Sequence, residues 1–274
     1  MRLFIRHPED AETVAHEIWR QVGEIGAPLD VGEDELTFVT DNSVLDNALA
    51  EAHVRCDASG NVTHCVMRLS KQCIDAPDEN ALNTVLLEAI HLRFLSGLQL
   101  SRVMCADQIE RDNIRFAGTT AAQRGFESDR ILLARYLYFF VDEVVAEKYL
   151  RERYPNRAPS RLRQYEAMQE DSWARREYER WMEPLRARVA YLHYLRSRLG
   201  EILAVGNPAV RATFEERSTA YWAIVTELMP PDRAEFLSPL AERILSARTD
   251  PIEWDEAAAE EGFAWVMAVP IPGP

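Results

Sequence analysis

The chain has 274 residues, of which 47% are hydrophobic, and a formal net charge of −14 at pH 7. This length and apolar content can fill one large domain or two smaller ones. The negative charge argues against general nucleic-acid binding, and the lack of about 18 uninterrupted apolar residues argues against a membrane span.

The first residues contain too short an apolar run for a signal peptide, so we expect a cytoplasmic protein. The four cysteines are sparse and form no CxxC pair. They therefore predict reduced thiols rather than disulfides or a cysteine-bound zinc ion.

The amino-terminal region combines short strands with one helix. Residues 3–5 and 35–41 are rich in β-forming side chains, and Pro8 opens a helical pattern over residues 8–22. Two further strands, 52–57 and 61–69, flank a turn that contains Gly and Asn and predict a β-hairpin.

A nearly all-apolar helix follows the hairpin at residues 81–98, with Pro77 and Asp78 as its start. It nevertheless carries Glu88 and His91, which share one helical face. Burying them without partners is costly, so they belong either to a site or to a paired structural group.

A second apolar helix is predicted at residues 131–150, capped by Ser128 and Asp129. Glu143 and Glu147 lie one turn apart on it, and the structural alternative for them is a solvated face paired with neighbouring cations. Residues 99–127 before this helix predict a loop or flap.

The remainder is helical by pattern and begins after a Pro-rich break at residues 155–159. We expect about five helices without a strand, the first from Ser160 to about Met182, and an extended Pro-rich tail. The predicted domains are residues 1–154 and 155–274. The predicted fold class is α+β, a small antiparallel sheet packed on a buried helix, followed by a mostly α-helical carboxy-terminal region.

One pentapeptide, Leu87-Glu88-Ala89-Ile90-His91, resembles the His-Glu-x-x-His motif of zincin-like peptidases of the gluzincin type. The preceding hairpin and the later acidic helix resemble the same family over residues 50–150. The resemblance implies that Glu88 is the general-base position, His91 the second histidine and Glu143 the third metal ligand.

Leu87 departs from the motif because leucine has no atom that ligates zinc. We therefore expect a degenerate site with no cofactor, in which zinc, if bound, would use His91 and Glu143. His53 and His64 are candidates to replace the missing ligand. The structural alternative pairs Glu88 with His91 or each with an arginine.

Residues 151–200 contain twelve Arg, no Lys and seven acidic residues. A basic segment with interleaved aromatic residues predicts a surface for an acidic partner. The alternative is a solvated face in which Arg175 pairs with Glu179. The chain has no second Glu-x-x-His motif, which argues against a di-iron site.

These patterns predict a pseudo-metallopeptidase, a non-proteolytic scaffold that binds a protein or peptide partner. We expect neither nucleic-acid nor membrane binding. The alternatives are a metal-dependent hydrolase with an altered ligand set, and a helical interaction protein that uses the Arg-rich segment 151–200.

Overall fold

The computed structural model describes residues 2–5, 35–38, 50–56, 62–69, 78–96, 120–230 and 234–273. Two compact units make up the chain. Unit 1 comprises residues 1–112 and 149–161, and unit 2 comprises residues 113–148 and 162–274. The predicted domain boundary after residue 154 falls within the second segment of unit 1 and stays a prediction.

Several sequence predictions lie wholly or partly outside the described residues. The helix at 8–22 and the hairpin turn at 58–61 lie wholly outside. The strand at 35–41 is described only to residue 38, the helix at 81–98 only to residue 96, and the loop or flap at 99–127 only from residue 120.

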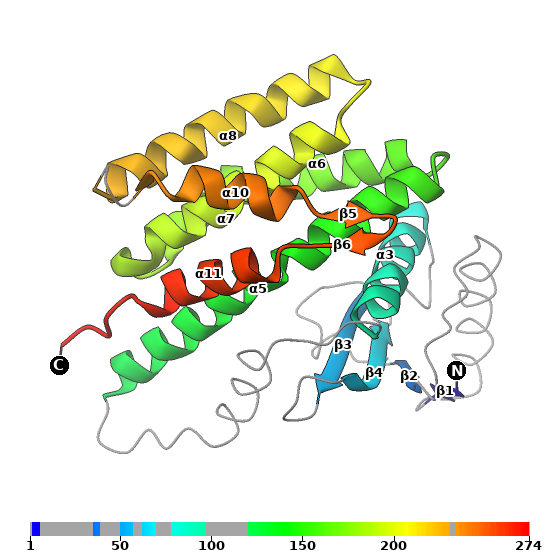
Figure 1. The fold of residues 1–274 in the computed structure, drawn as a ribbon, viewed down its shortest axis with the longest axis horizontal. Coiled ribbons are helices and arrows are strands. Elements are labelled where there is room, and N and C mark those ends of the chain that lie inside the picture. The colour runs from blue at the N-terminus through cyan, green and yellow to red at the C-terminus, as the bar shows by residue number, and fades with distance from the viewer. Residues whose placement is uncertain are drawn as a thin grey trace. The chain divides into compact units, whose positions relative to one another are not determined.

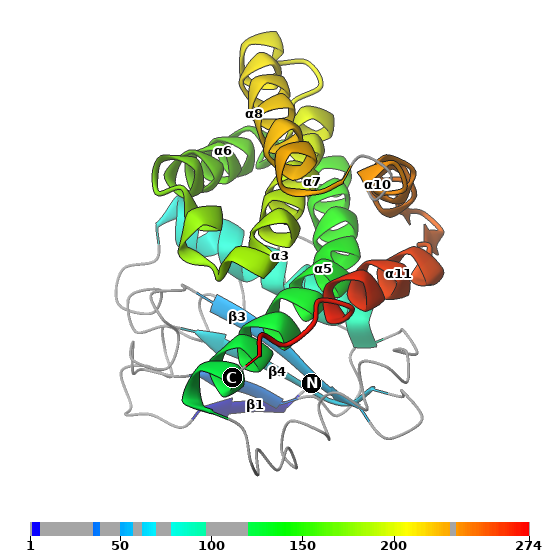
Figure 2. The same cartoon turned by 90° about the vertical axis from the view of Figure 1, so that its left-hand side faces the viewer.

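Unit 1 contains a four-stranded mixed sheet in the order β1-β2-β4-β3. The strands are β1 (Arg2–Ile5), β2 (Glu35–Phe38), β3 (Ala50–Cys56) and β4 (Val62–Leu69), which Figure 2 shows side by side. The antiparallel pairing of β3 with β4 confirms the predicted hairpin. The other two pairings are parallel, because β1 and β2 are far enough apart in sequence for the crossover that parallel strands need.

Helix α3 (Glu79–Ser96) packs against β3 and β4 (Figure 1). Its predicted start is confirmed, since Asp78 Oδ1 accepts a hydrogen bond from Ala81 N at 2.7 Å. Six apolar side chains of this helix are buried: Ala81, Val85, Leu86, Leu87, Ala89 and Ile90. The fold is therefore α+β, with a small sheet packed on a buried helix.

Helix α5 (Ala121–Arg153) begins earlier than predicted. Thr120 Oγ1 accepts from Gln123 N at 3.2 Å, and Gln123 Oε1 accepts from Thr120 N at 3.0 Å. This reciprocal pair is a capping box, so the predicted caps Ser128 and Asp129 lie inside the helix. Neither α5 nor any other described helix has the length and apolar character needed to cross a membrane.

The rest of the chain is mostly helical, as predicted. Its helices are α6 (Ala158–Ala174), α7 (Arg186–Leu203), α8 (Pro208–Leu228), α10 (Leu237–Leu245) and α11 (Glu256–Met267). The predicted helix to Met182 ends early, because Arg176 adopts a positive φ of 45°. Two 3-10 turns, η2 (Glu177–Arg180) and η3 (Glu183–Leu185), lead from there into α7.

The prediction that this region lacks strands is wrong. Strand β5 (Arg248–Thr249) pairs antiparallel with β6 (Ile252–Glu253). The turn at Asp250 and Pro251 reverses the chain, and Arg248 Nη1 lies 3.2 Å from Glu253 Oε2 across the pair. A two-residue strand leaves almost no periodic signal in a sequence.

Two cations of α5 satisfy the carboxyl ends of later helices. Lys148 Nζ donates to the carbonyl oxygens of Leu245 at 2.6 Å and Ala247 at 2.9 Å, at the end of α10. Arg130 Nη1 donates to the carbonyl oxygens of Met267 at 3.0 Å and Val269 at 2.6 Å, at the end of α11. These bonds hold both helices to α5 within unit 2.

Helices α7 and α8 form a close antiparallel pair because a glycine lies between them. A Cβ atom on Gly200 would overlap the ring of Phe214, which is itself fully buried. The approach of the two backbones therefore requires glycine at this position.

We predict that Gly200→Ala destabilises unit 2 by about 1 to 3 kcal/mol, since overpacking outweighs the gain in helix propensity. Urea unfolding followed by circular dichroism measures the shift. The matched control is Gly125→Ala, because nothing lies within 4 Å of a Cβ at this position in α5. It should stabilise the protein by about 0.5 to 1 kcal/mol, and equal effects of the two alanines would contradict the prediction.

Candidate functional site

Helix α3 is fixed within unit 1 by one buried amide. Asn83, which is 0% exposed, donates from Nδ2 to Ser160 Oγ at 2.9 Å. Arg157 Nη1 donates to Asn83 Oδ1 at 3.1 Å, and Ser160 Oγ donates to the Arg157 carbonyl at 3.0 Å. Both ends of the amide are therefore bonded to the start of α6.

No sequence pattern predicted this network, although the sequence contains one signal for it. Asn83 is a polar residue in an almost wholly apolar helix, and such a residue needs a partner. The partners Arg157 and Ser160 lie at and just after a segment with the composition of a linker, which hid their role. This network holds the site helix in place and takes no part in the predicted chemistry.

The degenerate motif lies on α3 one turn after Asn83. Leu87 is 6% exposed and belongs to the apolar core of unit 1. Glu88 and His91 are partly exposed, so the structure does not bury them as the apolar surroundings suggested. Each takes part in an interaction within the protein, which keeps the structural pairing open for both.

The donor set does not fit a zinc ion held by the family's pattern. A zinc site needs three protein ligands, and the first position is occupied by the buried side chain of Leu87. Among the residues that the structure describes, no three His, Cys, Asp or Glu side chains gather to hold a metal ion. The metal-ligand roles of His91 and Glu143 stay predictions.

Glu143 lies on the part of α5 that belongs to unit 2, where it has structural partners. Its Oε2 is 3.6 Å from Arg196 Nε on α7. The hydroxyl of buried Tyr165 lies 3.4 Å from Glu143 Oε1 and 3.0 Å from the Arg196 carbonyl. The carboxylate therefore helps to join α5, α6 and α7.

Glu147 does not lie on a solvated face as its structural alternative assumed. It is 1% exposed and has a partner within the protein. Lys148, one of the neighbouring cations, donates to the carbonyl groups at the end of α10. A buried carboxylate without a partner would be costly, so this engagement is what the packing requires.

Several arginines of the Arg-rich segment pair with carboxylates of this chain, and two of these pairs lie on the surface. Arg175 Nη2 pairs with Asp171 at 2.7 Å, and Arg176 Nη1 pairs with Glu179 at 3.2 Å. The predicted pair of Arg175 with Glu179 is therefore wrong. That pair required both residues to lie on one helix, and α6 ends at Ala174, before either of them. Arg196 and Arg198 also pair with carboxylates, which leaves less positive charge for a partner than the composition suggested.

We predict that Asn83→Leu destabilises unit 1 by about 1 to 3 kcal/mol, because it leaves Arg157 and Ser160 without their shared partner. Thermal unfolding followed by circular dichroism measures the loss. Ser160→Ala, alone and combined with Asn83→Leu, completes a double-mutant cycle. If the two losses simply add, the side chains do not act as one network.

Comparisons with protein-family models, with curated proteins and with solved structures gave no match for this chain. The resemblance to zincin-like peptidases therefore rests on the residues, their spacing and the element order.

Proposed function

We propose that this chain is a degenerate zincin-like protein that binds an extended peptide segment of a protein partner without cleaving it. The observation that carries the proposal is strand β3, which lies at the edge of the sheet and packs against α3. The order of an edge strand, its hairpin partner and then the motif helix supports the same proposal.

Strand β3 has the length that backbone recognition requires. It spans seven residues and pairs with β4 along one side, and no described strand pairs with its other side. Such an edge presents a row of N–H and C=O groups to an extended chain. A peptide that adds one strand to the sheet gains main-chain hydrogen bonds along this row.

The residues at the motif support binding over hydrolysis. Peptide hydrolysis by this family pattern needs a metal ion that activates water, and Leu87 supplies no ligand for it. Leu87 is packed in the core, and the side chains of His53 and His64, the candidates to replace the missing ligand, lie outside what the structure describes. A hydrolase with an altered ligand set stays the alternative, and Glu88 and His91, which each take part in an interaction within the protein, would be its first candidates.

We predict that a proline substituted at one of two adjacent positions in β3 weakens peptide capture while the protein stays folded. Successive N–H groups of a strand point to opposite edges, so either Ala52→Pro or His53→Pro removes only an outward-facing donor. Peptides selected on the wild-type protein from a displayed random library provide the probe. We expect this variant to weaken their binding at least about tenfold, measured by fluorescence anisotropy.

The proline that faces β4 is the internal control, because it breaks the hairpin and lowers the melting temperature. The informative variant is the one that keeps its wild-type melting temperature. Selection of no peptide by the wild-type protein, or unchanged binding by the folded proline variant, would overturn the proposal.

We further predict that Leu87→His creates a zinc site that the wild-type chain lacks. The substitution restores the family spacing of two histidines at one helical face. It removes about 2 kcal/mol of apolar burial, and zinc at about 100 times its Kd should return about 2.7 kcal/mol. Thermal unfolding with and without zinc measures both changes.

Leu86→His is the matched control, because Leu86 is also buried but lies outside the motif spacing. Its melting temperature should fall without any response to zinc. A folded Leu87→His variant that shows no more zinc response than Leu86→His would count against inherited site geometry.

A further inference from the structure

Four buried polar side chains of unit 2 each hold one atom without a hydrogen-bond partner among the described protein groups. The exposed fractions of these residues are 0 to 4%. The atoms are Gln169 Oε1 on α6, His193 Nδ1 and Ser197 Oγ on α7, and Tyr221 OH on α8.

Contacts between the helices place two of these groups together. The rings of His193 and Tyr221 stack with their centroids 5.1 Å apart and an interplanar angle of 16°. Trp173 of α6 packs edge-on against Tyr221, with centroids 5.0 Å apart. The three helices therefore meet at the level of Tyr221.

The other two groups lie about one helical turn along from this stack. Gln169 precedes Trp173 by four residues, and Ser197 follows His193 by four, so each shares the inward face of its neighbour. About two turns from Tyr221 along α8, Phe214 contacts Tyr165 of α6 and lies close to Gly200 of α7. Gln169 and Ser197 thus lie between two layers in which the three helices are in contact.

His193 is neutral in this position. Burial, followed by the charge of Arg196, lowers the pKa of His193 to about 3. Its Nε2 lies 3.7 Å from Glu177 Oε2, and this carboxylate favours the tautomer that carries the proton on Nε2. Because the imidazole is uncharged, the pair is no ion pair at pH 7, and Nδ1 is left as an acceptor.

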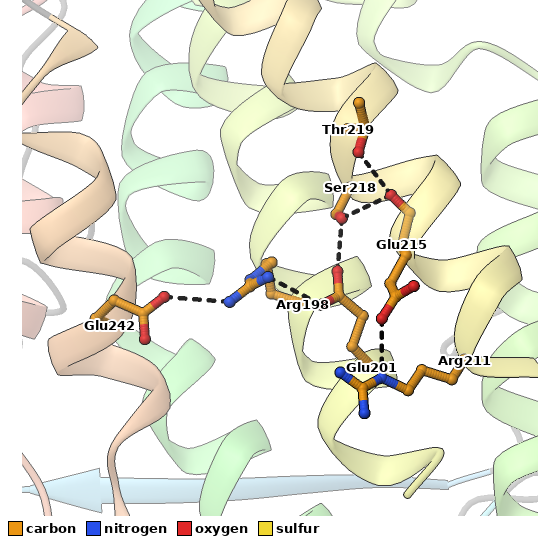
Figure 3. A network of polar contacts seen from close by, with 7 residues as sticks. All are labelled: Arg198, Glu201, Arg211, Glu215, Ser218, Thr219 and Glu242. Atoms are coloured by element: carbon orange, nitrogen blue, oxygen red, sulfur yellow. Dashed lines mark hydrogen bonds and ion pairs between the residues drawn. The ribbon is translucent and has the colours of Figure 1, made fainter. Parts of the chain in front are cut away.

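The neighbouring polar group on the same pair of helices shows what a satisfied group requires. Buried Glu201 accepts from Ser218 Oγ at 2.6 Å and from Arg198 Nη1 at 2.9 Å, and Arg198 Nη2 reaches Glu242 at 3.2 Å (Figure 3). The four atoms between α6, α7 and α8 receive no such bonds from the described protein groups. Left dry, each would cost as much as a lost hydrogen bond, which a marginally stable domain tolerates poorly.

We propose that a buried site between α6, α7 and α8 binds ordered water, with Gln169, His193, Ser197 and Tyr221 as its ligands. The set contains two acceptors and two hydroxyl groups that donate or accept, which matches the two donors and two acceptors of water. Water is also the smallest ligand that bridges such atoms. A zinc ion needs at least three imidazole, thiolate or carboxylate ligands, and this set offers one, the imidazole of His193.

Magnetic relaxation dispersion of water ¹⁷O in solutions of the full chain tests the proposal by counting long-lived internal water. The test variant is Gln169→Leu combined with Ser197→Ala, which replaces one ligand by an apolar side chain of similar size and removes the hydroxyl of the other without adding an atom. We expect the dispersion amplitude of the double variant to be lower than that of the wild-type protein by the contribution of at least one water molecule. The control is Thr226→Val, whose exposed hydroxyl bonds only to its own helix, and it should keep the wild-type amplitude.

If the double variant does not fold, the wild-type protein alone decides the question. Water-to-amide cross-relaxation at His193 and Ser197, together with the ¹⁵N shift of a hydrogen-bonded, unprotonated Nδ1, would support the site. An unchanged amplitude in a folded double variant, absent cross-relaxation, or a retained small molecule in native mass spectrometry would overturn it.

Discussion

Unit 2 depends on one constraint, that the carbonyl groups at the ends of its helices need hydrogen-bond donors. Helix α5 supplies donors to two of these helices. The last carbonyls of any helix lack partners within the helix. Lys148 and Arg130 each donate to the last carbonyl of a helix, α10 or α11, and to one carbonyl two residues beyond it. Because these donors are charged, their bonds are stronger than neutral ones and also oppose the negative end of the helix dipole.

The same requirement explains where polar residues occur in both cores. In unit 1, the amide of Asn83 is bonded at both ends and thereby fixes α3 to the start of α6. In unit 2, Glu201 is bonded by a hydroxyl and a guanidinium. The stack of His193 on Tyr221 differs, because it fixes helix contacts without bonding its polar atoms. Satisfied groups locate the helices, and unsatisfied groups indicate where a ligand belongs.

The sequence predicted those elements whose cause is local. The cap at Asp78, the β3–β4 hairpin and the α+β class follow from neighbouring residues, and the structure confirms them. The box formed by Thr120 and Gln123 is also local, but Thr120 belongs to the turn-rich run of residues 116–120, which indicated a loop. The pairing of Glu143 with Arg196 joins residues far apart in the chain, and no local pattern encodes it. A metal site also needs residues from distant parts of the chain to meet. The spacing of residues within one helix can suggest such a site but cannot show that its ligands meet.

Because position 87 is a leucine, the stability of α3 does not depend on the metal ion that the zincin motif would bind. A buried leucine stabilises a core by about 1.5 to 3 kcal/mol, whereas a buried histidine needs a metal ion or another partner to offset its desolvation. With leucine at this position, the packing of α3 against β3 and β4 requires no bound ion. Helix α3, which packs behind the proposed peptide-binding edge of β3, is therefore held by apolar burial and by the hydrogen bonds of Asn83, and neither requires zinc.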